Sequence, residues 1–504
     1  MQVQSVVAAP SQVEVEQNVA RVPSWTLTIV VIAFLTSLAI LVAGYHDGIE
    51  DDAIYLPAVK KLLNPALFPH DSEFFATQTK AFPVLRLVAV SVRITHVRVA
   101  WVEFAWQALS IFVLLAACWY TAGVVFRELR DRIGGVALVS VLLTMPVAGT
   151  ALYIADQHLH PRTLACAMIV FAVGAVLRKR LMTAMLCSVL ALAIHPLMAA
   201  FGIAFLIVLA APLERWMRPS LCGVMAALPI PVILNPSPAW KEAALTRSYF
   251  YLGQWTWYEW LGILGPLALM WWFSWVAEDM GLHKLALLCR RMSLYSVVLS
   301  LIGVAVSLPA QLRWLAPTQP MRHLQLVYLF MLLAGGGLIS HYVLRNRLWR
   351  WLALFLPLCG GMAYAQHQLF TTSPHIDLPS DHDSNRWVRC FNWIRENTPQ
   401  DAYFAVDPNY MSEQDEENIG FRAIAERSKL ADYSKDAAVV TVAPDLARKW
   451  EEQVDAMQGY EKFTRDDFLR LKNEFGVDWA LVEKDIPGLD CPYRQNGLAV
   501  CRIK

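Results

Sequence analysis

The chain has 504 residues, of which 56% are hydrophobic and 17% are charged. In soluble proteins roughly a quarter of the residues are charged, so this composition excludes an ordinary soluble enzyme. The net charge of +1 hides two unlike parts. Residues 1–370 hold 26 Lys and Arg against 17 Asp and Glu, whereas residues 371–504 hold 17 against 25. We therefore predict a lipid-embedded body and a water-soluble C-terminal domain, with a boundary near residue 371.

The apolar segments predict a polytopic α-helical membrane protein. Residues 1–24 are polar and lack the apolar region and cleavage site of a signal peptide, so we expect a cytoplasmic tail there. About 20 helical residues cross the hydrocarbon core of a bilayer. On this criterion the body, residues 25–370, is expected to hold about 11 transmembrane helices. The expected spans are 25–44, 100–126, 134–154, 162–177, 181–195, 197–213, 221–235, 260–277, 292–310, 324–344 and 351–370.

Basic residues predict the orientation, because short loops rich in Lys and Arg stay in the cytoplasm. With eleven spans, the basic clusters on one side are Arg127/Arg130/Arg132, Arg178/Lys179/Arg180, Arg215/Arg218, Lys284/Arg290/Arg291 and Arg345/Arg347/Arg350. The N-terminus is then cytoplasmic, whereas the first loop, residues 45–99, and the domain 371–504 are extracytoplasmic. In this loop Arg86, Arg93 and His96 lie among Val and Leu, which predicts an amphipathic helix on the membrane surface.

The C-terminal part is expected to be a small α/β domain. Helical spacing from Trp387 to Ile394 stops at Asn397. Thr464 with Asp467 resembles a capping box, for a helix that ends before Gly476. The other expected elements are a helix over 444–457 and strands at 402–406, 437–442, 477–482 and 498–503.

Two cysteines of this domain, Cys491 and Cys501, would lie in an oxidising compartment and could pair. The dipeptide Asn496-Gly497 predicts a hairpin turn between them. Simple pairing about that turn places the two cysteines on opposite faces of the hairpin. The sequence therefore leaves the disulfide open.

An acidic cluster, Glu50-Asp51-Asp52, directly follows the first span. Adjacent carboxylates repel and raise one another's pKa unless a cation or a base-like role accommodates them. The cluster therefore suits metal binding or proton abstraction. A solvated acidic loop on the non-cytoplasmic side is the alternative interpretation.

A second polar cluster, Asp156–Arg162, joins two expected spans on the same side. Ionisable groups at a membrane boundary are costly and often functional. Asp156, His158 and His160 could ligate a metal, whereas His160 and Arg162 could bind a phosphate or pyrophosphate. We therefore count His158, His160 and Arg162 among the candidate substrate-binding residues. Alternatively, these side chains bond loop backbone and lipid headgroups.

Three more residues are candidates for substrate binding at the outer ends of spans. Pro196 interrupts an apolar stretch, so His195 lies at a turn or faces a cavity. The guanidinium groups of Arg313 and Arg322 could grip a phosphate bidentately or anchor to lipid headgroups. In contrast, the glycines 335–337 lie inside a span and predict close helix packing.

The acidic pair Asp51-Asp52-Ala53-Ile54-Tyr55, after a first span and in a long outer loop, resembles the GT-C superfamily of integral-membrane glycosyltransferases. The resemblance covers the layout of residues 25–370 and points to an uncharacterised bacterial branch. It implies that Asp51 and Asp52 are catalytic, as a general base or as holders of a divalent cation. Oxygen ligands favour Mg²⁺ or Mn²⁺ as that cation, and Asp156 is a candidate further ligand from its own cluster. The usual acidic pair is Asp-Glu, so Asp-Asp leaves open which carboxylate matters.

The resemblance also implies a function: transfer of a sugar from a polyprenyl-phosphate donor to an unknown envelope acceptor. This reaction would take place on the outer face of a bacterial inner membrane. The expected partners are the bilayer, the donor lipid and that acceptor, with no nucleic acid. A transporter or flippase and an inactive envelope scaffold are the alternatives. The enzyme hypothesis requires Asp51, Asp52, His160, His195 and Arg322 to lie together.

Overall fold

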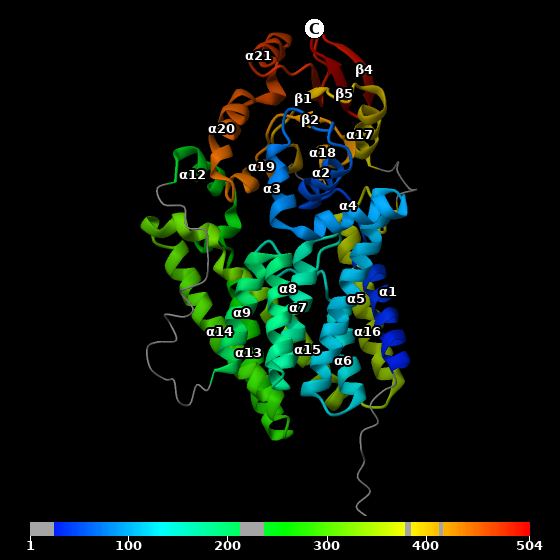
Figure 1. Cartoon of the computed structure of the whole chain (residues 1–504), viewed down its shortest axis with the longest axis vertical. Coiled ribbons are helices and arrows are strands. Elements are labelled where there is room, and N and C mark those ends of the chain that lie inside the picture. Colours follow the sequence, from blue (N-terminus) through cyan, green and yellow to red (C-terminus); the bar gives the residue numbers. More distant parts are fainter. Residues whose placement is uncertain (1–24, 212–235, 379–384, 413–416) are drawn as a thin grey trace, which may run out of the picture.

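The computed structural model describes residues 25–211, 236–378, 385–412 and 417–504. Helices form a long bundle, and a small sheet with its own helices covers one end of it (Figure 1). The helices up to residue 369 are α1 (Trp25–Ala43), α2 (Asp52–Leu63), α3 (Glu73–Ala81), α4 (Pro83–Thr95), α5 (Val99–Val125), α6 (Leu129–Val141), α7 (Pro161–Leu177), α8 (Leu181–Ile194), α9 (Pro196–Ala210), α12 (Pro238–Leu245), η1 (Ser248–Phe250), η2 (Leu252–Gln254), α13 (Trp257–Asp279), α14 (His283–Ser307), η3 (Ala310–Thr318), η4 (Pro320–His323), α15 (Leu324–Ile339), η5 (Ser340–Leu344) and α16 (Leu348–Leu369).

The C-terminal part contains all strands of the described sheet. Its elements are α17 (Arg386–Asn397), β1 (Tyr403–Val406), η6 (Tyr410–Ser412), α18 (Phe421–Ala425), β2 (Ser428–Lys429), α19 (Lys435–Val440), η7 (Pro444–Leu446), α20 (Ala447–Ala456), η8 (Tyr460–Lys462), α21 (Arg465–Phe475), β3 (Trp479–Val482), β4 (Asp490–Gln495) and β5 (Leu498–Arg502). The strand order is β2-β1-β3-β5-β4. β1 runs parallel to β2 and β3, and β5 is antiparallel to its neighbours β3 and β4.

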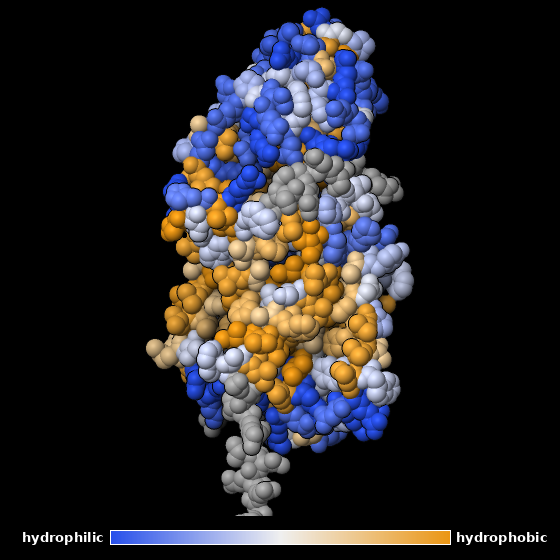
Figure 2. Space-filling view, turned by 90° about the vertical axis from the view of Figure 1, so that its right-hand side faces the viewer, coloured by the Kyte–Doolittle hydropathy of each residue, from blue (hydrophilic) through white to orange (hydrophobic). Residues whose placement is uncertain are grey.

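Within the described ranges, 6 helical segments are long and apolar enough to cross a membrane. They are Trp25–Ala43, Val99–Val125, Trp257–Asp279, His283–Ser307, Gln311–Leu344 and Leu348–Leu369, and α7, α8 and α9 are shorter apolar helices. A space-filling view shows a hydrophobic band across the visible face of the bundle, between hydrophilic ends (Figure 2). The expected count of eleven spans is not confirmed, and the expected span 221–235 lies outside the described residues.

One expected span is wrong. A helix over 134–154 was predicted from its apolar run, but α6 ends at Val141 and an irregular segment follows. Pro146 cannot donate a helical hydrogen bond, and Ala148 and Ala151 have positive φ angles of 44° and 52°. The segment is instead closed by an isolated bridge between Pro146 and Tyr153. It carries the chain to the polar cluster Asp156–Arg162.

The bundle interior contains a close contact between α6 and α15, as the glycines 335–337 predict. A Cβ atom on Gly336 would lie 2.4 Å from the carbonyl oxygen of Gly134. A Cβ on Gly337 would lie 2.1 Å from the ring of Phe126. The absence of side chains therefore permits the two helices to approach, which confirms the predicted packing role.

The C-terminal domain departs from prediction at one strand. Residues 437–442 were expected to be a strand but belong mostly to helix α19. The reason is the side chain of Asp432, which accepts hydrogen bonds from the backbone N–H groups of Lys435 and Asp436 at 2.5 and 3.0 Å. These bonds satisfy donors at the start of the helix, so a β-prone sequence becomes helical. The capping box of Thr464 and Asp467 is confirmed.

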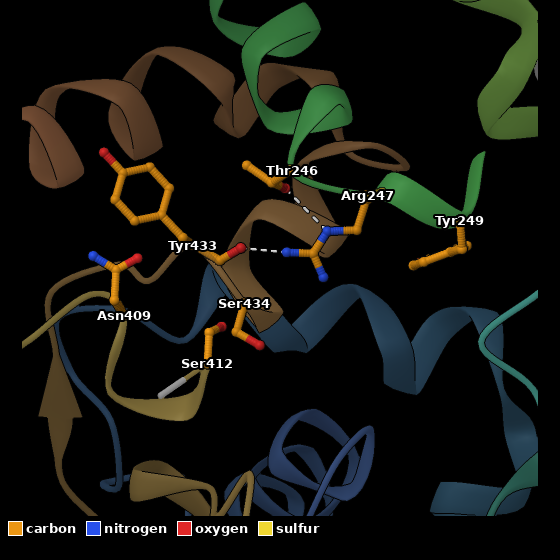
Figure 3. Close-up of a pocket in the computed structure, with 7 residues that line it drawn as sticks. All are labelled: Thr246, Arg247, Tyr249, Asn409, Ser412, Tyr433 and Ser434. Atoms are coloured by element: carbon orange, nitrogen blue, oxygen red, sulfur yellow. Dashed lines mark hydrogen bonds between the residues drawn. The ribbon is translucent and has the colours of Figure 1, made fainter. Parts of the chain in front are cut away.

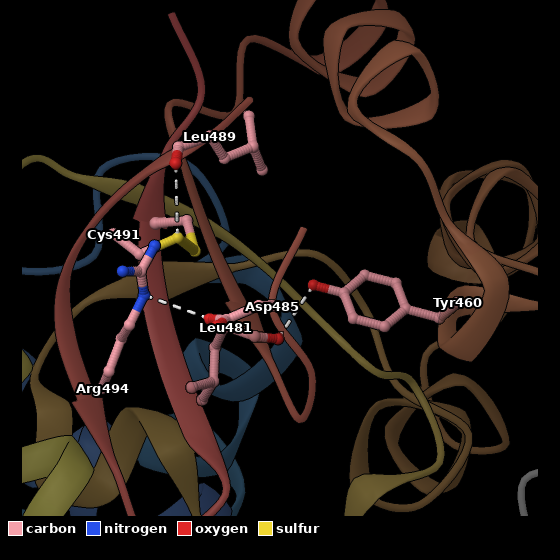
Figure 4. Close-up of a disulfide and its surroundings, with 7 residues drawn as sticks. Tyr460, Leu481, Asp485, Leu489, Cys491 and Arg494 are labelled. Carbon is pink, nitrogen blue, oxygen red and sulfur yellow. Dashed lines mark hydrogen bonds and ion pairs between the residues drawn. A yellow bond between two sulfur atoms is a disulfide. The ribbon is translucent and has the colours of Figure 1, made fainter. Parts of the chain in front are cut away.

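Cys491 and Cys501 form a disulfide across β4 and β5 (Figure 4). Simple pairing would have separated them. The register instead shifts between Asp490 and Tyr493, so two residues of β4 lie opposite one residue of β5. This bulge turns Cys491 toward Cys501.

The expected outer loop, residues 45–99, consists largely of helices α2, α3 and α4 and lies between the bundle and the sheet domain (Figure 1). Helix α4 matches the predicted amphipathic helix, and its apolar Leu87 and Ile94 are exposed. The loop is attached to the sheet domain by the buried Asp71, whose Oδ2 accepts hydrogen bonds from the Arg422 side chain and the Lys429 backbone N–H at 2.5 and 2.9 Å. The first loop and the sheet domain therefore form a single layer above the bundle.

Candidate functional site

The two aspartates of the acidic cluster have different surroundings. Asp51 precedes the first turn of α2, and 38% of its side chain is exposed. Asp52 is only 2% exposed, and its Oδ2 accepts a hydrogen bond from the backbone N–H of Gly48 at 2.7 Å. A substrate can therefore reach Asp51, whereas Asp52 is a buried group that stabilises the preceding turn.

His160 orients the carboxylate of Asp51. It is the N-cap of α7, and its Nδ1 accepts a hydrogen bond from the backbone N–H of Arg162 at 3.1 Å. The proton of the neutral imidazole is then on Nε2, which lies 3.3 Å from Asp51 Oδ2 and 3.4 Å from the hydroxyl of Tyr55. Burial, followed by the charge of Arg162, lowers the pKa of His160 to about 4. His160 therefore donates a hydrogen bond to Asp51 as a neutral group.

A lysine from the C-terminal domain completes the surroundings of Asp51. The buried Lys435 contacts Asp51 Oδ1 at 3.2 Å and Glu50 Oε2 at 3.0 Å. Burial alone would raise the pKa of Asp51, but Lys435 and His160 hold that pKa well below its usual range. Conversely, burial disfavours the charged lysine, yet Glu50 and Asp51 raise the pKa of Lys435. Asp51 is thus an ionised carboxylate at neutral pH.

Cationic and imidazole side chains lie next to Asp51. His195 is the N-cap of α9, and its ring stacks on that of His160 with centroids 5.9 Å apart. The positive charge of Arg322 acts on His195, Asp51 and Tyr55. Within the described chain, the buried Nε of Arg322 has no hydrogen-bond partner. Arg322 therefore has donor capacity left for an anionic ligand.

Arg162 and Asp156 are paired with each other. Arg162 donates to Asp156 Oδ1 at 2.7 Å and to Oδ2 at 2.7 and 3.1 Å, and both side chains are buried. This bidentate pair fixes the guanidinium next to His160. Both oxygens of the Asp156 carboxylate therefore already accept hydrogen bonds from Arg162.

The three carboxylates expected to hold a divalent cation do not form one ligand set. Asp156 is held by Arg162, Asp52 faces Gly48, and Asp51 alone lies at the accessible position. Over the described ranges, one group of three His, Asp or Glu residues has ligand atoms within 4.8 Å of one another, namely Glu128, Asp131 and His341. That group lies at the other end of α6 and α15. Near the site, the carboxylates of Glu50 and Asp51 both contact the ammonium group of Lys435.

Two predicted substrate-binding residues lie apart from the accessible position. His158 is 3% exposed, and neither ring nitrogen has a hydrogen-bond partner among the residues that the structure describes. The centroid of the His158 ring lies 6.0 Å from that of the His160 ring, so His158 lies beside His160. Arg313 is exposed on η3, where its charge acts on Tyr251. The structure therefore brings together Asp51, His160, His195 and Arg322 but not Arg313.

Lys435, Glu50 and Tyr55 have contacts that sequence reasoning missed. Lys435 is 384 positions from Asp51, and no local pattern marks it. Glu50 belongs to the recognised acidic cluster, but its partners Lys435 and Asn418 are in the C-terminal domain. Tyr55 is the tyrosine of the Asp-Asp-Ala-x-Tyr motif. Its spacing from Asp51, at the start of a helix, could have predicted that the two side chains lie close to the same site.

Together these residues can perform acid–base chemistry next to an anion. An ionised carboxylate with an accessible face can accept a proton from a hydroxyl. Cations beside it can stabilise a departing phosphate. The remaining contacts hold the carboxylate in one position.

Comparisons with known proteins give distant likenesses. A family model described as a domain of unknown function (DUF6798) matches residues 385–457, the segment that carries Lys435. A search of curated proteins finds no match. The apo crystal structure of the Archaeoglobus fulgidus oligosaccharyltransferase has 12% identity and a TM-score of 0.49, over 91% of this chain and 69% of that chain.

Two further structures of proteins from that organism are similar. The complex of the oligosaccharyltransferase with Zn and sulfate has 12% identity and a TM-score of 0.43, over 90% of this chain and 68% of that chain. The oligosaccharyltransferase AglB with an inhibitory peptide and a dolichol-phosphate has 10% identity and a TM-score of 0.43, over 91% and 70%. At these values the likeness carries no argument about activity, and function has to be argued from the site.

Proposed function

We propose that the protein is a membrane glycosyltransferase that transfers a sugar from a polyprenyl-phosphate donor to an envelope acceptor. The observation that carries the proposal is the position of Asp51. It is an accessible, ionised carboxylate held by His160 and Lys435. The charge of Arg322 acts on Asp51, and among the described residues the buried Nε of Arg322 has no hydrogen-bond partner. This combination matches what glycosyl transfer from a lipid phosphate needs.

In the proposed reaction Asp51 accepts the proton of the acceptor hydroxyl as its oxygen attacks the anomeric carbon. The bond between that carbon and the phosphate oxygen breaks, and the phosphate leaves with the electron pair. Arg322 and the fixed Arg162 stabilise the negative charge that develops on the phosphate. His160 keeps Asp51 in position and is not itself the base, because its pKa of about 4 leaves it neutral with Nδ1 already bonded.

We place this site on the extracytoplasmic face of a bacterial inner membrane, with the N-terminus in the cytoplasm. The body 25–370 would carry the spans, and the first loop 45–99 and the domain 371–504 would form the outer layer. The basic clusters at the opposite end of the bundle, such as Arg127 and Arg345, support this orientation. A Mg²⁺ or Mn²⁺ ion, if the enzyme uses one, would be held by Glu50 and Asp51 in exchange for Lys435. No step above passes through such an ion.

Substitution of each aspartate separately tests the proposal. Asp51→Asn should lower kcat by roughly 10²–10⁴-fold, the contribution of a general base. Asp52→Asn should retain most of the wild-type rate, because this residue faces Gly48 rather than the accessible position. Transfer by purified protein from polyprenyl-phosphate donors into membrane acceptors measures both. Equal loss in the two variants, or full activity of Asp51→Asn, would remove Asp51 from the proposed role.

A further inference from the structure

A polar pocket lies between the bundle and the C-terminal domain, directly beside the candidate site. Its volume is about 480 Å³, within the range of small-molecule sites. One wall comes from the segment after α12 and the other from the C-terminal domain (Figure 3). The lining residues are Thr246, Arg247, Tyr249, Asn409, Ser412, Tyr433 and Ser434.

The pocket adjoins the site at two points. Ser434 precedes Lys435, whose ammonium group contacts Asp51 and Glu50. On the other wall, the ring of Tyr249 lies 5.8 Å from the guanidinium carbon of Arg322. A ligand with its reactive end at Asp51 and Arg322 can therefore extend into the pocket.

Several polar groups of the lining are not used by the protein itself. Among the described residues, no hydrogen bond engages the side chains of Asn409, Ser412 and Ser434. In contrast, Arg247 is held in place, because it donates to the Thr246 hydroxyl at 3.0 Å and to the carbonyl oxygen of Tyr433. The lining thus offers an amide, hydroxyls and a fixed guanidinium, with the ring of Tyr249 at the end near the site.

These groups suit a carbohydrate. Hydroxyl and amide side chains both donate and accept hydrogen bonds, as sugar hydroxyls require. An aromatic ring offers an apolar face for the C–H groups of a sugar ring. The lining contains Arg247 and no carboxylate, so it accepts a uronic acid as well as a neutral sugar. A lipid tail would find too few apolar side chains here.

We propose that this pocket is a saccharide-binding subsite, built by the C-terminal domain together with Thr246, Arg247 and Tyr249. The proposal rests on the glycosyl transfer proposed above and deepens it, since it names what the C-terminal domain binds. The saccharide is either the outer part of the donor glycan or part of the acceptor. Both have the same chemistry, so the experiment must distinguish them.

Direct binding tests the subsite without any chemistry. The full chain in nanodiscs is exposed to an array of neutral and uronic mono-, di- and trisaccharides. We expect at least one saccharide to be retained. Asn409→Trp, at an exposed position on the rim, should fill the pocket and weaken retention at least tenfold. Lys462→Trp, also exposed in the C-terminal domain and outside the pocket, is the matched control and should bind like the wild type.

Two milder variants separate pocket filling from misfolding. Ser434→Ala removes one hydroxyl of the lining, and Ser248→Ala removes an exposed hydroxyl that does not line the pocket. The first should weaken binding several-fold, and the second should not. No retained saccharide, or equal retention by the wild type and Asn409→Trp, would overturn the subsite.

Competition assigns the source of the saccharide. If a polyprenyl-phosphate-linked sugar displaces the bound saccharide, the pocket holds the donor glycan; if both bind together, it holds the acceptor. Both outcomes support the subsite. Binding that persists while no transfer is found would refute the proposed function alone, since Asp51 takes no part in the array measurement. Transfer without saccharide binding would refute the subsite alone.

Discussion

The charge of Asp51 depends on one lysine from a different part of the chain. Burial favours the neutral acid, and Lys435 is the largest of the effects that oppose burial. A nearby opposite charge typically lowers a carboxyl pKa by about 1–3 units. The low pKa keeps Asp51 ionised at the working pH, as a general base requires. Lys435 thus serves the proposed reaction although it need not touch the substrate.

Lys435→Met should therefore raise the pKa of Asp51. The acidic limb of the pH profile of kcat/KM should move up by about 1–3 units, because a higher pH is needed to ionise Asp51. Lys449→Met is the control, since Lys449 pairs with Glu73 rather than with Asp51. A uniform loss of rate with an unmoved acidic limb would show that Lys435 only holds the domain in place.

Asp52 gives a second prediction, on stability. Burial raises the pKa of Asp52 to about 7, with a smaller contribution from Asp47, against 3.8 for a free aspartate. Between pH 3.8 and about 7 the folded protein therefore binds more protons than the unfolded chain. The contribution of Asp52 to stability is present at low pH and is lost as pH rises through about 7.

Removing the ionisable carboxyl group of Asp52 should abolish this loss of stability at high pH. Asp52→Asn should approach the wild type in thermal stability as pH falls toward 3.8 and exceed it near pH 8, as measured by melting curves in detergent. The exposed Asp445→Asn should track the wild type throughout. A wild-type advantage that grows with pH would contradict the assignment of Asp52 as a buried, partly protonated group.

The sequence alone predicts some residues of the candidate site and misses others. Asp51, His160, His195 and Arg322 were predicted because each belongs to a short polar cluster at the end of an apolar segment. Lys435 was not, since its role arises only when residues 384 positions apart meet. The sequence does not tell which of the adjacent residues Asp51 and Asp52 faces solvent, so this distinction also needed the structure.

At the scale of elements, the contact of α6 with α15 depends on missing side chains. Gly336→Ala would place a Cβ 2.4 Å from the Gly134 carbonyl. We expect a loss of about 1–3 kcal/mol, the usual cost of overpacking, and a lower melting temperature. Gly360→Ala in α16 meets no atom within 4 Å. It should stabilise by roughly 0.5–1 kcal/mol, because alanine is the better helix residue. Equal shifts in both variants would exclude helix contact as the cause.

Elements were predictable where local chemistry decides them. The helix at 465–475 follows its capping box, and α17 follows its apolar spacing. The failures share a cause. The segment 437–442 has β-prone residues, but the Asp432 side chain begins a helix there. The apolar run 134–154 is broken at Pro146 and bridged to Tyr153, a contact that hydropathy does not reveal.

At the scale of the whole molecule, buried charges fix the C-terminal domain to the first loop. The C-terminal domain meets the first loop through a buried ion pair, in which Arg422 contacts Asp71 at 2.5 Å. Within its own domain Arg422 also contacts Asp436 at 2.8 Å. Removing one partner of a buried pair leaves an uncompensated charge. The layer that carries Lys435 is therefore fixed over Asp51, and the proposed site exists only when both parts are folded together.

Orientation is the whole-molecule property on which the proposed function depends. Among the described residues, the basic clusters around Arg127, Lys179, Lys284 and Arg345 lie at the opposite end of the bundle from the C-terminal domain, and basic loops stay in the cytoplasm. The disulfide between Cys491 and Cys501 agrees with this orientation, because such bonds persist outside the reducing cytosol.

Fusion to reporter proteins tests the orientation. A phosphatase that folds only in an oxidising compartment should be active in a bacterial host when fused after residue 504. The same fusion after residue 346, between η5 and α16, should be inactive, and a fluorescent protein that folds only in the cytosol should give the reverse pattern. Activity of the phosphatase at residue 346 alone would place Asp51 on the cytoplasmic side, where the proposed acceptor chemistry could not occur.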